Sequence, residues 1–142
     1  MKKFLLVIIL GLFLFSFSKK EDSYTAISQD TKFAESIKRG EEIYIDMCTS
    51  CHMANGEGKL NVYPPLAKSD YLMQKREASI RAIKYGLRGK IVVNGVTYKK
   101  MMSRLGLLDD EVADVMNYIT NSWGNKNPKM ITVEEVKAVS KK

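Results

Sequence analysis

The sequence predicts a small all-α domain in which two long helices enclose an irregular middle. Apolar residues recur at helical spacing over residues 31–47 and again over residues 109–122. The about 60 residues between these segments are rich in glycine, proline and polar turn residues, with only short periodic stretches. Because such a segment packs poorly on its own, we expect a large apolar group to fill the centre of the fold.

The N-terminus has the pattern of an export signal. Lys2 and Lys3 precede an apolar run over residues 4–17, which is shorter than the ~20 residues that cross a bilayer. Small residues at its end suit a cleavage that removes residues 1–18. A retained segment would instead be an anchor that tethers the domain to the membrane. Both outcomes predict a periplasmic location or one at the extracytoplasmic face of the inner membrane.

The rest of the chain divides into three parts. Residues 19–31 are polar and unpatterned, which predicts a linker, and residues 32–125 form the expected domain. Residues 126–142 form a C-terminal tail, in which the pattern from Thr132 to Glu135 predicts a capping box that starts a short helix. With 142 residues, 45% of them hydrophobic and 27% charged, the chain has room for one globular domain.

The first helix carries one apolar face that contains a glycine. The members of this face lie three or four positions apart: Phe33, Ile37, Gly40, Tyr44 and Met47. Glycine destabilises a helix interior by about 1 kcal/mol relative to alanine. Gly40 is therefore either a place where another backbone comes close or an accident near the end of the helix.

Short elements are expected in the middle, before a second long helix. In order, they are helices over 69–74 and 77–85 and a hairpin with strands 91–93 and 96–98. The Asn94-Gly95 dipeptide suits the tight turn of this hairpin. The last helix, over 109–122, begins with three acidic residues, which favour its positive end. Its buried face follows the i, i+3, i+4, i+7 pattern through Val112, Val115, Met116 and Ile119.

The pentapeptide Cys48-Thr49-Ser50-Cys51-His52 has the spacing of a c-type haem attachment site. Thiols three positions apart can reach the two vinyl groups of one porphyrin edge and form thioether bonds. The imidazole that follows directly can then bind the iron from one side. Both cysteines and the only histidine of the chain belong to this motif. We therefore expect one covalent haem c, with His52 as an iron ligand.

Three other interpretations of the two cysteines are weaker. A disulfide between residues this close would restrain little of the unfolded chain. A thioredoxin-like redox pair needs a strand-to-helix context, whereas this pair follows a helix. A zinc site would have two cysteines and a histidine but would lack a fourth ligand of the usual type.

The second axial ligand has to be something other than histidine, unless that iron position stays open. Methionine is the common partner in electron-carrying cytochromes. Of the eight methionines, Met101 and Met102 lie in a loop before the last helix, where a chain can fold over the far face of a haem. Met73 is a further candidate, and all three could equally fill gaps in a core. Met102 is our first choice.

Together these residues resemble a class I monohaem cytochrome c over nearly all of the chain after the linker. The family has a glycine and an aromatic residue in the helix before the attachment site, matched by Gly40 and Tyr44. Its Pro-x-Leu after the haem loop is matched by Pro64-Pro65-Leu66. The resemblance implies a class I cytochrome c fold, with N- and C-terminal helices packed around the haem. It also implies that the Pro64 carbonyl accepts a hydrogen bond from the His52 ring.

The C-terminal half is similar to a narrower group, the periplasmic cytochrome c domains associated with nitrite reductases and terminal oxidases. The similarity lies in residues 93–98, 107–119, 121–125 and 131–139. In that group the ligand methionine lies four residues after a tyrosine, which selects Met102 after Tyr98. Ser103 stands where the family has proline, which predicts a less rigid ligand loop. Leu108 stands where a serine cap is usual, so Asp109 is expected to cap the last helix.

These features favour an electron carrier rather than an enzyme. His52 and Met102 would stay bound in both iron oxidation states, and a respiratory or nitrite-reducing protein would be the redox partner. A net charge of +7 suits docking on an acidic protein or a position near anionic lipid, and it could equally serve only to keep the protein soluble. The scattered basic residues do not indicate a nucleic-acid partner. Arg88, Tyr98 and Trp123 are candidates, by position alone, for holding the haem propionates.

The alternative function is a haem-based sensor or small-ligand binder with an open sixth iron position. Ser103 and the paired methionines are its only support. A peroxidase-like enzyme would need a distal histidine, and the sequence contains no second histidine.

Overall fold

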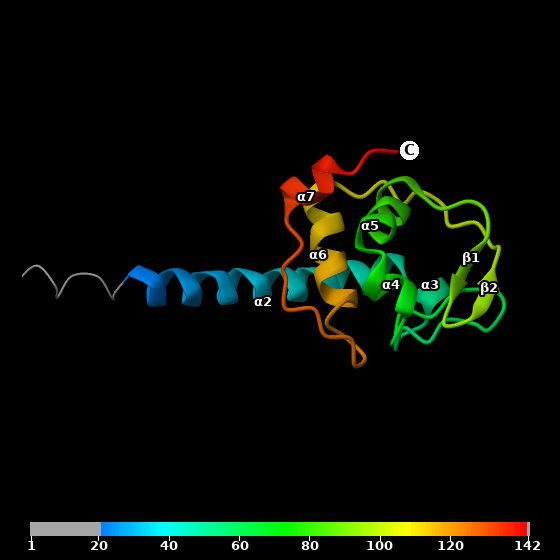
Figure 1. Cartoon of the computed structure of the whole chain (residues 1–142), viewed down its shortest axis with the longest axis horizontal. Helices are drawn as coiled ribbons and strands as arrows, with labels where there is room; N and C mark the ends of the chain where they lie inside the picture. Colours follow the sequence, from blue (N-terminus) through cyan, green and yellow to red (C-terminus); the bar gives the residue numbers. More distant parts are fainter. Residues whose placement is uncertain (1–20, 142) are drawn as a thin grey trace, which may run out of the picture. The chain divides into compact units, whose positions relative to one another are not determined.

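The computed structural model describes residues 21–141, so the expected signal or anchor segment, 1–18, lies outside the described residues. The elements in chain order are α2 (Glu21–Met47), α3 (Thr49–His52), α4 (Asp70–Gln74), α5 (Arg76–Tyr85), β1 (Ile91–Val93), β2 (Val96–Tyr98), α6 (Asp109–Ile119) and α7 (Val133–Ala138) (Figure 1). The chain forms two units, one ending at Lys32 and one starting at Phe33. The second unit is helical with one small hairpin, as predicted. No helix within 21–141 is both long and apolar enough to cross a bilayer.

Residues 21–31 belong to α2, so the expectation of an unpatterned linker there is wrong in its secondary structure. The helix begins at Glu21 and runs without interruption to Met47. The segment is polar, but it contains neither glycine nor proline, the two residues that most disfavour a helix interior. The periodic pattern of apolar residues that predicts a helix starts only at Phe33, so it does not reveal the polar turns before that residue.

Helices α2 and α6 cross at Gly40 (Figure 1). A Cβ atom at this position would overlap the backbone carbonyl of Asp114 and come within 2.8 Å of the Tyr118 Cβ. Beside the crossing, Arg39 donates two hydrogen bonds of 2.6 and 2.9 Å to the Asp114 carboxylate, and Ser36 donates a third of 2.6 Å. The hydrogen bonds to Asp114 and the negative charge of this carboxylate raise the pKa of Arg39. Gly40 is therefore a point of close backbone approach.

The hairpin and the last helix lie where the sequence predicts them, with one difference in the cap. Strands β1 and β2 are antiparallel, and both turn residues, Asn94 and Gly95, have positive φ. The N-cap of α6 is Leu108, whose N–H donates to the Glu111 carboxylate at 2.7 Å. Asp109 is the first residue of the helix and not its cap, and its carboxylate forms an ion pair of 2.9 Å with Lys84 of α5.

The hydrophobic core extends into the segment that the sequence analysis treated as a tail. Its fully buried side chains include Tyr44, Ile80, Val112, Val115, Met116, Ile131 and Val136. The last two come from the C-terminal segment, which therefore completes the domain. α7 starts as expected, because the Thr132 hydroxyl accepts the Glu135 N–H at 3.2 Å. Asn117 fixes the approach to α7 by exchanging two hydrogen bonds of 2.7 and 2.9 Å with the backbone of Ile131.

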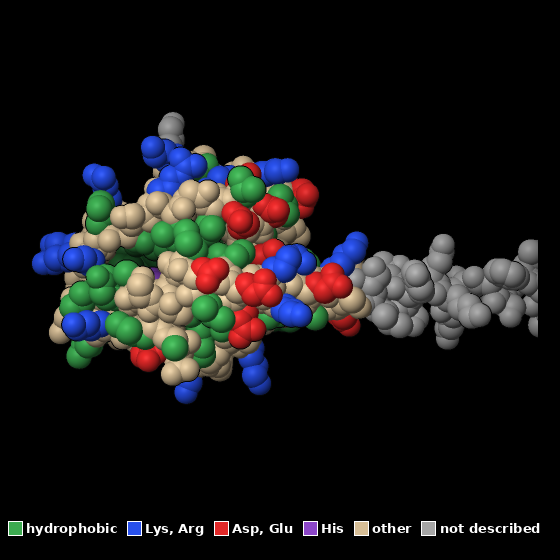
Figure 2. Space-filling model, turned by 180° about the vertical axis from the view of Figure 1, so that it is seen from behind, with side chains coloured by type: hydrophobic (Ala, Val, Ile, Leu, Met, Phe, Trp, Pro, Cys, Tyr) green, Lys and Arg blue, Asp and Glu red, His purple; other side chains and the backbone are tan. Residues whose placement is uncertain are grey.

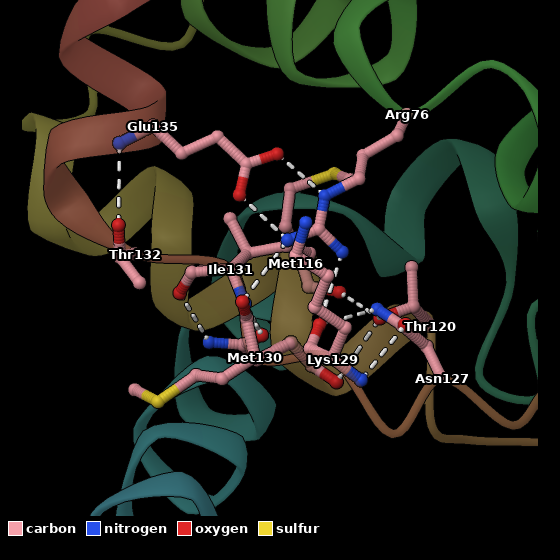
Figure 3. A network of polar contacts seen from close by, with 10 residues as sticks. Arg76, Met116, Thr120, Asn127, Lys129, Met130, Ile131, Thr132 and Glu135 are labelled. Atoms are coloured by element: carbon pink, nitrogen blue, oxygen red, sulfur yellow. Dashed lines mark hydrogen bonds and ion pairs between the residues drawn. The ribbon is translucent and has the colours of Figure 1, made fainter.

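A polar network ties this C-terminal segment to the start of α5 (Figure 3). Arg76 makes a bidentate ion pair of 2.5 and 2.6 Å with Glu135. The same guanidinium donates to the carbonyls of Lys129 and Met130, each at 3.0 Å. About two turns further along α5, Lys84 donates to the Val136 carbonyl at 2.9 Å. α7 is thus held by charge as well as by apolar packing.

Candidate functional site

The two cysteines and the histidine share one short helical turn. The Cys48 N–H donates to Tyr44 at the end of α2, and the N–H groups of Cys51 and His52 then donate to the Cys48 carbonyl at 3.1 and 2.9 Å. Both thiols are free and line the same cleft. Burial, with a smaller contribution from Cys51, raises the pKa of the Cys48 thiol to about 11. The sequence-predicted trio is therefore brought together by α3 and the N-cap residue before it.

The His52 ring is oriented by the Pro64 carbonyl, as the family resemblance implied. The Nδ1 atom lies 2.9 Å from this oxygen. A carbonyl only accepts hydrogen bonds, so Nδ1 carries the proton and Nε2 keeps a free lone pair. Burial lowers the pKa of His52, and the Pro64 bond opposes that shift only in part. The imidazole is neutral, which is the form that binds a metal.

Gly58 permits the approach of Pro64 to the histidine loop. Its φ is +64°, and a Cβ atom there would lie 2.7 Å from the Pro64 oxygen and 2.5 Å from the Tyr63 oxygen. Its N–H donates to the His52 carbonyl at 3.0 Å. Asn125, near the C-terminal end of α6, supports the same loop. It accepts from the Lys68 N–H and donates to the Leu66 carbonyl, both at 2.9 Å.

An aromatic cluster of Tyr44, Tyr118 and Trp123 supports the attachment loop. The ring centroid of Tyr44 lies 5.5 Å from that of Tyr118 and 4.8 Å from that of Trp123. The Tyr44 hydroxyl donates to the Met53 carbonyl at 2.6 Å, directly after the histidine. Met53 has a positive φ of 63°, so this bond holds a backbone conformation that a non-glycine residue seldom adopts. Trp123 is a candidate for holding a haem propionate by its position in the sequence alone, but it does not line the cavity and instead packs on Gly56.

A backbone bridge anchors Met102 at the cavity that His52 also lines. Its N–H donates to the Leu87 carbonyl at 3.0 Å, and its carbonyl accepts the Leu87 N–H at 2.9 Å. Its half-buried side chain lines the same cavity as His52. Met101, one residue earlier, is 51% exposed. Met73 is also exposed and lines no part of this cavity.

The cavity has an outer and an inner chamber. The outer chamber, of about 560 Å³, is lined by Cys48, Cys51, Tyr98 and Lys100, among others. The inner chamber lies against α4 and α5. Five residues line both chambers: His52, Pro64, Leu87, Ile91 and Met102. Figure 2 shows a hollow framed by hydrophobic side chains, with basic side chains gathered at that end of the molecule.

The donor set and the size of the cavity fit a covalently held haem. Two free thiols, an imidazole with a free Nε2 and the thioether-bearing Met102 all line it. Cofactor pockets commonly enclose roughly 300–1,000 Å³, a range that includes the outer chamber. Of the three candidates for the propionates, Tyr98 lines the outer chamber and Arg88 borders a separate groove.

Comparisons with known proteins agree with this fit. Residues 37–123 match the family model described as cytochrome c. The chain is 39% identical over 112 residues to cytochrome c-552 of Thermus thermophilus, a match that covers 72% of this chain and 85% of that protein.

Two longer proteins are also similar. The cytochrome c subunit of alcohol dehydrogenase (quinone) from Gluconacetobacter polyoxogenes is 29% identical over 106 residues, or 68% of this chain. The cytochrome c subunit of gluconate 2-dehydrogenase from Pantoea cypripedii is 29% identical over 139 residues, or 91% of this chain. The chain covers only 21% and 31% of these two subunits. The family match and the cavity together identify the chain as a class I monohaem cytochrome c that carries one covalently attached haem c.

Proposed function

We propose that this cytochrome transfers electrons through a haem attached to Cys48 and Cys51, with His52 and Met102 as the two axial ligands of the iron. Haem-based electron transfer is the activity of the family to which the chain belongs. The assignment of the two axial ligands rests on one observation: His52 and Met102 both line the two chambers of the cavity. The two thiols lie beside His52 in the outer chamber only.

The surrounding residues favour ligands that stay in place. When bound, the haem supplies an iron centre that gains and loses one electron. Pro64 fixes the proton on Nδ1 of His52, so that Nε2 is always the donor to the metal. The bridge between Leu87 and Met102 restrains the opposite ligand. Two ligands held by the backbone need little rearrangement when the charge of the iron changes.

The partner in this proposal is a redox protein with an acidic docking surface. Lys100 lines the mouth of the outer chamber, and exposed basic residues lie at the same end of the molecule (Figure 2). Basic groups around a cofactor opening steer an acidic partner towards it. Similarity to cytochrome subunits of two dehydrogenases supports redox proteins as partners in general. We place the protein on the extracytoplasmic side, as a soluble or tethered carrier without catalytic activity of its own.

Optical spectra of the ferric and ferrous protein test this proposal. We expect a low-spin spectrum with the near-infrared band of methionine bound to ferric iron. Met102→Ala should abolish this band, whereas Met101→Ala, a matched change at the neighbouring exposed methionine, should retain it. A high-spin spectrum that responds readily to carbon monoxide or cyanide in the unchanged protein would contradict axial ligation by Met102. It would favour a haem-based sensor or ligand binder instead.

A further inference from the structure

A groove beside the methionine loop, residues 99–108, gathers four basic side chains. It encloses about 460 Å³. The basic residues come from α5, the turn after it, the methionine loop and the C-terminal segment: Arg81, Arg88, Arg104 and Lys141. Among the described residues that line this basic groove, none is an aspartate or a glutamate. The groove therefore concentrates positive charge that no carboxylate of its own lining offsets.

The arginines of the chain separate into two groups by their partners. Of the five arginines, three form ion pairs with carboxylates: Arg39, Arg76 and Arg81. The other two, Arg88 and Arg104, both line the basic groove, and both are exposed. Within residues 21–141, neither side chain forms a hydrogen bond or an ion pair, and the same holds for Lys141. The arginines without a partner thus meet at one place.

The backbone holds these two arginines close to Met102. Arg88 directly follows Leu87, whose backbone pairs with that of Met102. Arg104 lies two residues after the methionine. Gly86 packs on the same loop, because a Cβ atom there would lie 2.8 Å from the Met102 oxygen and 3.0 Å from the Arg104 nitrogen. An anion held by both arginines therefore joins the two chain segments that form the bridge.

The donors of the basic groove fit a phosphate group. An arginine presents a planar fork of N–H donors that matches the oxygens of a phosphate or a carboxylate. Here the donors come from separate segments of the chain, and the exposed Ser103 adds a hydroxyl to the lining. A tetrahedral group with oxygens on every side can accept from donors in several directions, whereas a planar carboxylate best matches a single fork. The arrangement therefore favours a phosphate over a carboxylate.

We propose that the basic groove binds a phosphate-bearing anion between Arg88 and Arg104. Arg81 is bonded to Glu77 and donates to the Ser140 carbonyl at 2.9 Å, so it shapes the wall of the groove and adds charge to it. A free phosphate anion and the headgroup of an anionic lipid present the same oxygens to these donors. Binding in this groove does not depend on the axial ligation in the proposed function.

An anion in the basic groove should hold the methionine loop in place. By contacting Arg88 on one segment and Arg104 on the other, it favours the arrangement in which the bridge between these segments is formed. By linkage, conditions that open the bridge then weaken binding of the anion. The site would thus regulate how firmly Met102 stays at the cavity. Only this consequence rests on the proposed ligation by Met102.

Calorimetric titration of the haem-containing full chain with inorganic pyrophosphate tests the binding site. The buffer is free of phosphate, and the ionic strength is kept constant because salt screens charges. The double variant Arg88→Gln, Arg104→Gln should bind pyrophosphate at least about tenfold more weakly. The matched control is Lys59→Gln, Lys126→Gln, which removes the same charge at two exposed positions outside the groove. This control should bind as the unchanged protein does.

A flotation assay with lipid vesicles distinguishes the two sources of phosphate. Vesicles of phosphatidylglycerol are compared with vesicles of phosphatidylcholine, which carry no net charge and report any insertion of the N-terminal segment. Retention that is specific to phosphatidylglycerol and is lost in the arginine variant identifies a lipid headgroup. Binding of pyrophosphate without such retention identifies a free anion. The proposal is overturned if neither probe binds, or if both double variants weaken binding equally, since net charge alone would then explain the result.

Stopped-flow displacement of Met102 by imidazole tests the effect on the loop. A saturating amount of the probe that binds should slow this displacement about fivefold in the unchanged protein and leave the arginine variant unaffected. Equal rates with and without the probe would overturn the effect on the loop. Absence of the near-infrared band in the unchanged protein would instead contradict ligation by Met102, whereas the calorimetric result for the basic groove is independent of that band.

Discussion

Met102 and Leu87 form an isolated antiparallel bridge in which each residue donates one backbone hydrogen bond to the other. Leu87 follows directly on the glycine that ends α5, so the bridge ties the methionine loop to a helix of the core. Successive side chains of an extended segment point to opposite faces. This alternation accounts for the half-buried Met102 and the exposed Met101. The bridge also supplies a restraint that the serine at position 103, in place of the family's proline, does not provide.

Ser103→Pro should stiffen the methionine loop further. Proline restricts the residue before it to extended conformations, and Met102 already pairs in an extended bridge. We expect carbon monoxide and imidazole to displace the methionine more slowly in this variant, measured by stopped-flow absorption. Ser103→Ala is the control and should leave the rates unchanged. Faster displacement in the proline variant would mean that the backbone at position 103 requires a conformation that proline cannot adopt.

Gly40→Ala should strongly destabilise the protein. The new Cβ would overlap the Asp114 carbonyl, and both backbones belong to packed helices that cannot shift freely. We expect a loss of about 3 kcal/mol in the free energy of unfolding, measured with guanidinium. Lys38→Ala, at an exposed position of the same helix, is the control and should change it little. Equal effects of the two substitutions would contradict the close crossing of α2 and α6.

Tyr44→Phe removes one hydrogen bond from the loop that follows His52. The Tyr44 hydroxyl is bonded to the Met53 carbonyl, and its burial raises the pKa of this phenol above the ordinary value, so it stays a donor across the physiological range. We expect the free energy of unfolding to fall by about 1 kcal/mol. The matched control is Tyr63→Phe, at a half-buried tyrosine that lines the cleft. The prediction fails if the two changes cost the same.

The ion pair between Arg76 and Glu135 should make the attachment of α7 sensitive to acid. The hydrogen bond from Arg76 is the main reason that the pKa of Glu135 lies below the ordinary value of 4.5. A lowered folded-state pKa means that this stabilisation is complete above pH 4.5 or so and is lost as pH falls through the folded-state value. A double-mutant cycle with Arg76→Gln and Glu135→Gln should give a coupling of about 1 kcal/mol at neutral pH. We expect no coupling once the carboxylate is protonated. Equal coupling at both pH values would contradict this explanation.

Much of the haem site could be predicted because its chemistry is local in sequence. The spacing of Cys48, Cys51 and His52 predicts the attachment motif, and the resemblance to the family implied the contact between His52 and Pro64. Gly40 was ambiguous, since the sequence does not say what lies opposite a glycine. The partner of that glycine, the Asp114 backbone, is distant in the chain and is found only in the folded structure.

Other features depend on tertiary contacts that no local pattern encodes. The capping box at Thr132 predicted α7, but not the burial of Ile131 and Val136 that makes it part of the core. The polar start of α2 was missed for the opposite reason, since helix formation there needs no apolar face.

Because Ile131 and Val136 are buried, the core of the domain can be completed only after residues 131–136 have been synthesised. Because a ribosome synthesises the N-terminal part first, Cys48 and Cys51 are present in the growing chain before the last helix. Until residues 131–136 have been synthesised, the core lacks two of its fully buried side chains. Thiol chemistry at the attachment motif and closure of the domain are therefore separate events in time. Closure of the domain therefore depends on residues 131–136.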